Sequence, residues 1–234
     1  MSAGMTQRLE TEHKYEVGAD FTLPDLAGLA AGLSVTGPAV HHLDASYFDT
    51  PDLRLAAAGI TLRRRTGGTD AGWHLKLPVS AGTRRELHAP LGDGPAAVPG
   101  VLARQVAGQA AGQPLRLVAI LTTIRTVWRL TGPGGEARAE VADDQVTGQR
   151  PDLGTTVSWR EIEVELTGGG PDILAAAGAR LRAAGARPSA AASKLSRVLG
   201  LAPDGSAPAD SAPDDPAPDD PDPGEAGGRQ AAGG

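Results

Sequence analysis

Polar and apolar positions alternate over two strand-length segments that lie far apart in the sequence. Residues 9–15 place Glu10, Glu12 and Lys14 two positions apart, and this period puts all three on one face of a strand. Residues 159–166 repeat the spacing, with three glutamates on one face and aliphatic side chains on the other. The alternation predicts two strands that each carry a charged face.

Shorter segments between these two predict further strands and a few helices. Glycine and proline interrupt the alternation at 67–70 and 132–135, where we expect hairpin turns. The predicted strands are 9–15, 42–49, 60–66, 73–78, 83–89, 117–131, 136–143 and 156–166, and the predicted helices are 24–32, 52–58, 97–111, 172–186 and 189–199. About eight antiparallel strands with connecting helices indicate a mainly β fold that closes into a barrel.

The middle strands carry cations where the first and last carry carboxylates. Same-face positions hold Arg63 and Arg65, then Lys76, then Arg125 and Arg129. Closing the sheet would bring both sets of charges into one lumen. Burying that many charges without a ligand is costly, so the pattern favours a polyanionic ligand that carries a divalent metal.

Composition limits the alternatives. A chain of 234 residues with 40% hydrophobic content can bury one sizeable core, and one domain is the default expectation. The sequence has no cysteine, which excludes disulfides and thiolate metal sites. We find neither a signal-type N-terminus nor an apolar run of about 18 residues, and therefore expect a cytoplasmic protein without a membrane span.

The net charge of −6 comes mainly from one end of the sequence. Residues 203–234 contain eight acidic residues and one basic residue, so the rest is nearly neutral. A nearly neutral body argues against a general nucleic-acid-binding surface, and we expect no nucleic-acid partner. We predict a flexible N-terminus (1–6), an ordered domain (7–201) and a disordered acidic tail rich in Pro, Ala, Asp and Gly (202–234).

The segment Glu10-x-Glu12-x-Lys14 resembles the ExExK signature of the CYTH family, also called triphosphate tunnel metalloenzymes. The likeness extends from about residue 7 to residue 201. Further landmarks of the family follow in order: Tyr47 to Thr50, Leu62 to Arg65, Trp73 to Lys76, Arg84 to Glu86, Arg125, Arg129, Glu140 to Asp143, Glu161 to Glu165, and Ser193 with Lys194.

The resemblance implies an eight-stranded antiparallel tunnel, with covering helices, that binds a linear triphosphate and one or two divalent ions. Carried over to this sequence, the phosphate-binding residues are Lys14, Arg63, Arg65, Lys76, Arg125, Arg129 and Lys194. The metal-binding residues are Glu10, Glu12, Asp143, Glu161 and Glu163, and the catalytic set is Glu10, Glu12, Lys14, Glu161 and Glu163. Three further acidic candidates are Glu86, Glu140 and Glu165.

The chemistry of these residue types agrees with the assignment. The planar guanidinium group of arginine matches phosphate oxygens bidentately. Carboxylate and phosphate oxygens suit hard ions, so the expected cofactor is Mg²⁺ or Mn²⁺. Positioning and charge neutralisation supply most of the catalysis of phosphoryl transfer. These arguments predict hydrolysis of a terminal phosphoanhydride bond.

The substrate expected from the sequence is inorganic triphosphate. Thiamine triphosphatases, which are similar through residues 47–76, usually carry Trp two residues before the first tunnel arginine, and Thr61 stands there. Adenylate cyclases of this fold need a nucleoside pocket, for which we identify no aromatic residue. These two activities, RNA 5′-triphosphate removal and a non-catalytic module that binds polyphosphate or nucleotide stay open as alternatives. Many bacterial CYTH domains precede a helical CHAD domain, so such a domain is an expected partner in a longer form.

Overall fold

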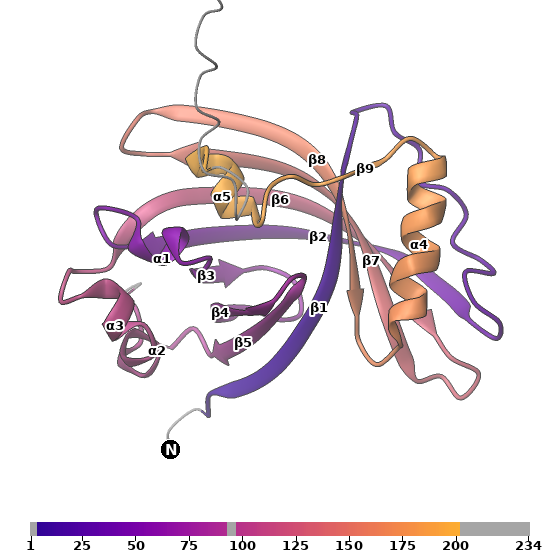
Figure 1. Cartoon of the computed structure of the whole chain (residues 1–234), viewed down its shortest axis with the longest axis horizontal. Coiled ribbons are helices and arrows are strands. Elements are labelled where there is room, and N and C mark those ends of the chain that lie inside the picture. Colours follow the sequence, from indigo (N-terminus) through magenta and orange to yellow (C-terminus); the bar gives the residue numbers. More distant parts are fainter. Residues whose placement is uncertain (1–3, 93–96, 202–234) are drawn as a thin grey trace, which may run out of the picture.

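The computed structural model describes residues 4–92 and 97–201, and the predicted disordered tail (202–234) lies outside them. Eight strands form a closed antiparallel sheet in the order β5-β4-β3-β2-β6-β7-β8-β1, with β1 pairing back to β5 and a short β9 added to β1 (Figure 1). The elements are β1 (Thr6–Val17), β2 (Ser34–Asp49), α1 (Arg54–Ala57), β3 (Thr61–Thr66), β4 (Gly72–Ser80), β5 (Thr83–Ala89), α2 (Gly100–Gln105), α3 (Ala107–Ala110), β6 (Arg116–Thr131), β7 (Ala137–Arg150), β8 (Thr155–Leu166), α4 (Pro171–Ala183), β9 (Arg187–Pro188) and α5 (Lys194–Leu199). The predicted eight-stranded antiparallel tunnel is confirmed.

Strand β1 closes the ring by dividing its pairing between two neighbours. Its first half, Thr6–Thr11, pairs with β5, and its second half, Glu12–Val17, pairs with β8. On the edge opposite β8, β1 continues past its contact with β5 and pairs with β9 at Tyr15 and Glu16. The β1 register sets Glu12 opposite Glu165 and Lys14 opposite Glu163, so the two charged faces predicted from the sequence lie side by side.

The helices cover different parts of the ring. Figure 1 shows α4 on the opposite side of the molecule from α1, α2 and α3. Leu174 and Leu181 of α4 pack in one apolar cluster with Ile162 and Val164 of β8, on the face of that strand that bears no glutamate. Gly178 allows this close approach, because a Cβ atom there would lie 2.2 Å from the Tyr15 hydroxyl oxygen. These contacts fix the charged faces of β1 and β8 toward the interior.

Helix α5 packs on the opposite side of the sheet wall, inside one end of the ring. Its residues Leu195, Val198 and Leu199 form a buried cluster with Tyr47 of β2 and Leu121 of β6. Tyr47 lies opposite the inward-facing Arg63 of β3, and Leu121 lies on the same face of β6 as Arg125, four positions further on. The apolar face of α5 therefore fills that end of the ring.

Several element boundaries differ from the sequence prediction. The helix predicted at 24–32 is wrong, because this segment forms turns. The Asp25 carboxylate accepts a hydrogen bond from the Ala27 backbone N–H at 2.9 Å, and Gly28 has a φ of 68°, which breaks a right-handed helix. Strand β2 begins eight residues earlier than predicted and β7 continues to Arg150.

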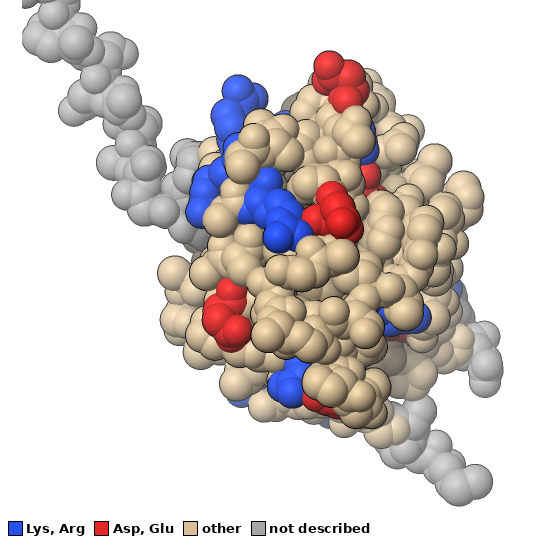
Figure 2. All heavy atoms as spheres, turned by 90° about the vertical axis from the view of Figure 1, so that its right-hand side faces the viewer, with Lys and Arg blue, Asp and Glu red and all other residues tan. Residues whose placement is uncertain are grey.

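The face seen from the α4 side is mostly uncharged. Figure 2 shows one group of Lys and Arg side chains near its top, with acidic side chains beside it and separated from one another by uncharged surface. This is consistent with the placement of many charged residues inside the ring. Among the helices that the structure describes, none is long and apolar enough to span a membrane.

Candidate active site

A cavity of about 610 Å³ occupies the interior of the ring and is lined mainly by charged side chains. The exposed residues Thr6, Gln7, Thr69 and Thr167 border it at one end, which is therefore an open mouth. Ser193 and Lys194 border it at the end that α5 fills. The cavity is thus a tunnel with one open and one closed end.

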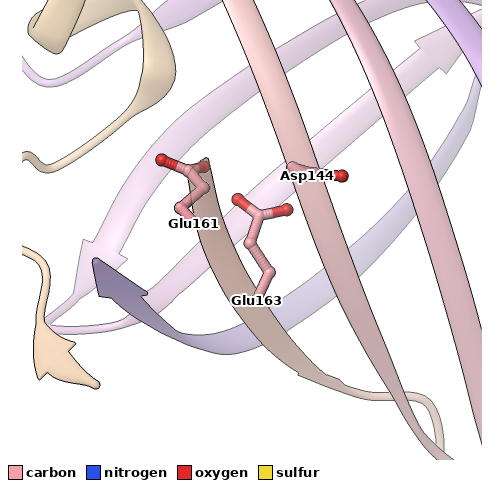
Figure 3. A group of neighbouring side chains, drawn as sticks. All are labelled: Asp144, Glu161 and Glu163. Carbon is pink, nitrogen blue, oxygen red and sulfur yellow. The ribbon is translucent and has the colours of Figure 1, made fainter. Parts of the chain in front are cut away.

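Three carboxylates gather near the closed end. Asp144 of β7 and Glu161 and Glu163 of β8 are buried, and each offers an oxygen within 4.8 Å of the others (Figure 3). The Lys194 ammonium lies among them, 2.8 Å from Asp144, 2.5 Å from Glu161 and 2.8 Å from Glu163. One cation therefore already lies among these three carboxylates. Their oxygen atoms are the kind of donor that Mg²⁺ and Mn²⁺ prefer.

The charge of Lys194 also sets the protonation state of the cluster. Burial alone would raise the pKa of Glu163, but the charges of Lys194 and Lys14 outweigh it and hold that pKa well below its ordinary value. The same carboxylates hold the pKa of Lys194 well above its ordinary value, against the effect of burial. Glu163 is therefore ionised at neutral pH, as metal binding requires.

The carboxylates of β1 lie beside the cluster, on the strand that pairs with β8. Lys14 forms ion pairs with Glu12 and, at 3.2 Å, with Glu163. Burial works to raise the pKa of Glu12, but Lys14 lowers it to about 2. Glu10 pairs with Lys76 at 2.6 Å. Each predicted residue of the ExExK segment therefore lines the tunnel.

The opposite wall is cationic. Arg63 and Arg65 of β3 line the tunnel, and the buried Nε atom of each has no hydrogen-bond partner within the described parts of the chain. Arg63 contacts the Tyr47 hydroxyl at 3.3 Å, and Arg65 pairs with Asp70 of the β3–β4 turn. Burial together with the charge of Arg63 lowers the pKa of Arg65 to about 9. These under-partnered guanidinium groups are suited to an anionic ligand.

Arg125 links the cationic wall to the acidic cluster. Its guanidinium group donates to Asp144 at 2.7 and 2.5 Å and to Glu163 at 2.5 Å. This places Arg125 in the tunnel, as predicted. The predicted residues that line the tunnel are Glu10, Glu12, Lys14, Arg63, Arg65, Lys76, Arg125, Glu163 and Lys194.

Two predicted residues lie elsewhere. Asp143 points to the opposite side of β7, where Arg160 donates to it at 2.9 and 2.7 Å. Its neighbour Asp144 takes the inward position, because successive side chains of a strand alternate between faces. Arg129 is half-exposed and pairs with Glu140 at 2.8 Å, so it does not line the tunnel that the described residues form.

Sequence reasoning also missed residues that the ring brings together. Arg8 lies at the mouth, 2.5 Å from Glu10 and 2.8 Å from Glu86. His74 bridges Glu86 at 2.8 Å and the Asp70 carbonyl oxygen at 2.9 Å. The period of two identifies both, since Arg8 precedes Glu10 by two positions and His74 precedes Lys76 by two.

Helix α5 presents Lys194 to the cluster because its first turn is fixed. Ser193 accepts a hydrogen bond from the Ser196 N–H at 3.0 Å, and the Ser196 hydroxyl accepts one from the Ser193 N–H at 2.9 Å. This reciprocal capping box defines the start of the helix. Val198 packs against β7 at Gly148, where a Cβ atom would lie 2.3 Å from it. The cap and the apolar contact together orient the lysine.

Fold and site define an antiparallel tunnel protein with a metal-competent acidic cluster facing a cationic wall. The chain belongs to the CYTH domain family, whose match covers residues 8–198.

Two uncharacterized proteins from two strains of Mycobacterium tuberculosis are each 42% identical over 208 residues, covering 83% of this chain and 40% of theirs. The chain therefore spans less than half the length of these curated relatives.

Solved structures of the same fold are more distant in sequence. A protein from Bacillus halodurans, described as a candidate adenylate cyclase, matches with a TM-score of 0.52 and 18% identity, covering 82% of this chain and 97% of that one. A protein from Hippeastrum, described as a candidate adenylyl cyclase with a dominant triphosphatase activity, matches with a TM-score of 0.49 and 16% identity over 82% of this chain and 95% of that one. At such identities the likeness concerns the fold alone.

Proposed function

We propose that this domain hydrolyses the terminal phosphoanhydride bond of inorganic triphosphate with the help of Mg²⁺ or Mn²⁺. The observation that carries the proposal is the opposition of charges in one tunnel. A buried carboxylate cluster faces the guanidinium groups of Arg63 and Arg65, whose buried Nε atoms have no hydrogen-bond partner among the residues that the structure describes. These Nε atoms are free to bind phosphate oxygens, and a divalent ion could take the place that the Lys194 ammonium holds among the carboxylates.

The residues fit roles in this reaction. Arg63, Arg65 and Lys76 would bind the phosphate chain from the cationic wall, and Asp144, Glu161 and Glu163 would hold a divalent ion, with Glu10 and Glu12 as a second acidic pair. A bound ion would polarise phosphoryl oxygens and lower the pKa of a water. Displacement of the Lys194 ammonium by the ion would free it to bind a phosphate oxygen.

The chemical step requires an in-line water. A bond forms between the water oxygen and the terminal phosphorus, and the bond from that phosphorus to the bridging oxygen breaks with its electron pair leaving on pyrophosphate. The water proton passes to a tunnel carboxylate. Arg125, which contacts the cluster, is placed to stabilise the charge that develops on the phosphoryl oxygens.

The lining of the tunnel favours an inorganic substrate. Thr61 is buried and lines the tunnel at the position where the related thiamine triphosphatases usually carry Trp. Among the described lining residues, the aromatic rings are those of Tyr47, His74 and His88. The ring of His74 is engaged by hydrogen bonds to Glu86 and the Asp70 carbonyl oxygen.

Phosphate release from tripolyphosphate with Mg²⁺ or Mn²⁺ tests the proposal. We expect Glu163→Gln to lower turnover by at least about 100-fold, as losses of preorganised charge typically do. The matched control is Glu136→Gln, because Glu136 is exposed and pairs with Arg138. Binding without release would instead indicate a polyphosphate-binding module, cyclic AMP formation from ATP a cyclase, and release from thiamine triphosphate alone a thiamine triphosphatase. The CHAD-type partner domain in a longer form stays a prediction.

A further inference from the structure

A second cavity of about 700 Å³ lies in the wall of the ring, beside the closed end of the tunnel. It lies along β1, between the end of the pairing with β5 at Thr11 and Thr83 and the start of the pairing with β9. Along this edge, the Glu12 N–H donates to the Gly82 carbonyl oxygen at 3.1 Å, and the Ser189 N–H donates to the Lys14 carbonyl oxygen at 2.9 Å. The cavity therefore borders a seam in the ring.

The side cavity and the tunnel share three charged residues. Glu12, Lys14 and Arg84 line both. Arg84 donates a hydrogen bond to the Ala192 carbonyl oxygen, in the loop that leads to α5. This side chain thus spans the seam from β5 to the α5 loop. Arg84 therefore lies between the two cavities, and rotation of this side chain is the movement that a passage between them would require.

The closed end of the tunnel makes such a passage useful. In the proposed reaction, a triphosphate that entered through the mouth would place its terminal phosphate next to Lys194 and the acidic cluster. After cleavage, pyrophosphate lies between the orthophosphate and the mouth, while the apolar face of α5 blocks the other end. Orthophosphate would then have to wait for pyrophosphate to leave.

We propose that the side cavity is an exit port for orthophosphate, gated by Arg84. This inference rests on the proposed hydrolysis. The shared residues lie at the Lys194 end of the tunnel, since Lys14 contacts Glu163 and Arg84 contacts the loop before α5. An organic group on the substrate would project toward the mouth and away from this cavity. Apart from the three shared residues, Arg182 is the one arginine or lysine among the described residues that line the cavity, and Pro78 and Pro188 are also among them, so few groups would retain a small anion.

Filling the cavity tests the port. Ala191→Trp and Ala81→Trp, each at a lining residue, should leave the single-turnover rate of tripolyphosphate cleavage unchanged. Steady-state turnover should fall by about tenfold or more, after a burst of one phosphate per tunnel, because product release would become rate-limiting. Ala175→Trp, on an exposed position of α4, is the matched control and should behave as the unaltered chain does. Unchanged steady-state turnover in folded Ala191→Trp and Ala81→Trp, or an equal loss in single turnover, would overturn the port.

A second experiment needs no hydrolysis. The exchange of inorganic phosphate can be followed by phosphorus NMR while methylenediphosphonate occupies the mouth end of the tunnel. We expect exchange in the unaltered chain and in Ala175→Trp, and at least about tenfold slower exchange in Ala191→Trp, in line with the kinetic prediction. No exchange in the unaltered chain would overturn the port even if tripolyphosphate is hydrolysed. Exchange without any hydrolysis would instead overturn the proposed function and leave the port as an anion passage.

Discussion

Two neighbouring aspartates show how the strand period assigns roles to single residues. Asp144 faces the tunnel and joins Glu161 and Glu163, whereas Asp143 pairs with Arg160 on the other face. Both are buried, so burial alone does not distinguish them. Their partners distinguish them, because of the two only Asp144 belongs to a group of carboxylates that can share a cation.

The pair gives a matched test of the metal site. Asp144→Asn should lower metal-dependent phosphate release by about 100-fold, in the range found when a preorganised charge is removed. Asp143→Asn should stay within about threefold of the unaltered turnover, because the Asp143 carboxylate lies on the other face of β7; loss of its buried ion pair with Arg160 should lower stability instead. Parallel calorimetric titration with Mn²⁺ checks whether affinity follows activity. Equal losses in both variants would contradict the assignment of Asp144.

The raised pKa of Glu165 predicts that the free energy of unfolding depends on pH. Burial and the negative charge of Glu10 raise its pKa from 4.5 to about 7. The folded state therefore retains a proton that the unfolded state releases, so stability falls as pH rises from about 4.5 to about 7 and then levels off. Glu165→Gln should remove this decline and raise the melting temperature at pH 8 more than at pH 5. A thermal melt of the ligand-free protein at both values checks this, and an equal shift at both would contradict it.

The alternation of side chains along a strand explains which residues could be placed inside the tunnel from the sequence. Glu10, Glu12 and Lys14 were placed correctly because a single unbroken alternation contains them. Asp143 was misplaced because Glu140 and Asp143 differ by three positions, which leaves the inward face of β7 ambiguous until its register with β6 is known. The structure sets Asp144 opposite Arg125, and that pairing over 19 residues is not encoded in the local pattern.

At the scale of elements, α5 has the largest influence on the site relative to its length. It contains six residues, too few to be stable alone. Its capping box and its apolar contacts with the inner wall hold it in place. The sequence pattern predicted a helix here but began it at Ser189, because Ser189 also resembles an N-cap. In the structure the Ser189 hydroxyl accepts a hydrogen bond from the Ala191 N–H at 3.2 Å, within the loop.

Loss of the cap should loosen Lys194. Ser193→Ala removes the side chain that accepts from the Ser196 N–H and should destabilise the helix end by about 1 kcal/mol. We expect a lower turnover number and a melting temperature lower by a few degrees, since a loosened helix holds the ammonium less often in the cluster. Ser34→Ala, at an exposed position of β2, is the control. A change in melting temperature with unaltered turnover would show that α5 does not position the lysine.

At the scale of the whole molecule, the ring encloses acidic and basic side chains whose charges a ligand can compensate. The fold class followed from the sequence because many short alternating segments with turn signals have few compact solutions. Closure into a barrel was predicted, but the strand pairs that make it were not, because the division of β1 between β5 and β8 depends on contacts between residues far apart in the chain. The helices were predicted less well than the strands for the same reason, since tertiary packing decides their ends.

Ligand binding should therefore stabilise the fold. Tripolyphosphate at about 100 times its dissociation constant should add about 2.7 kcal/mol to the free energy of unfolding. A thermal shift of several degrees is expected in the unaltered chain and in Arg64→Gln, whose position alternates with the tunnel arginines. The double substitution Arg63→Gln with Arg65→Gln should remove most of the shift. An undiminished shift in that double variant would place the anion outside the tunnel.

The divided strand β1 also has a consequence for biosynthesis. During translation, the second half of β1 (Glu12 to Val17) has no partner on its β8 side until β8 is synthesised, roughly 150 residues later. Contacts of such long sequence separation slow folding. Until they form, an acidic ribbon with an open backbone edge is available to other nascent chains, and mutual repulsion between its glutamates would protect it from self-association. The glutamates that line the finished ring would thus also limit self-association during synthesis.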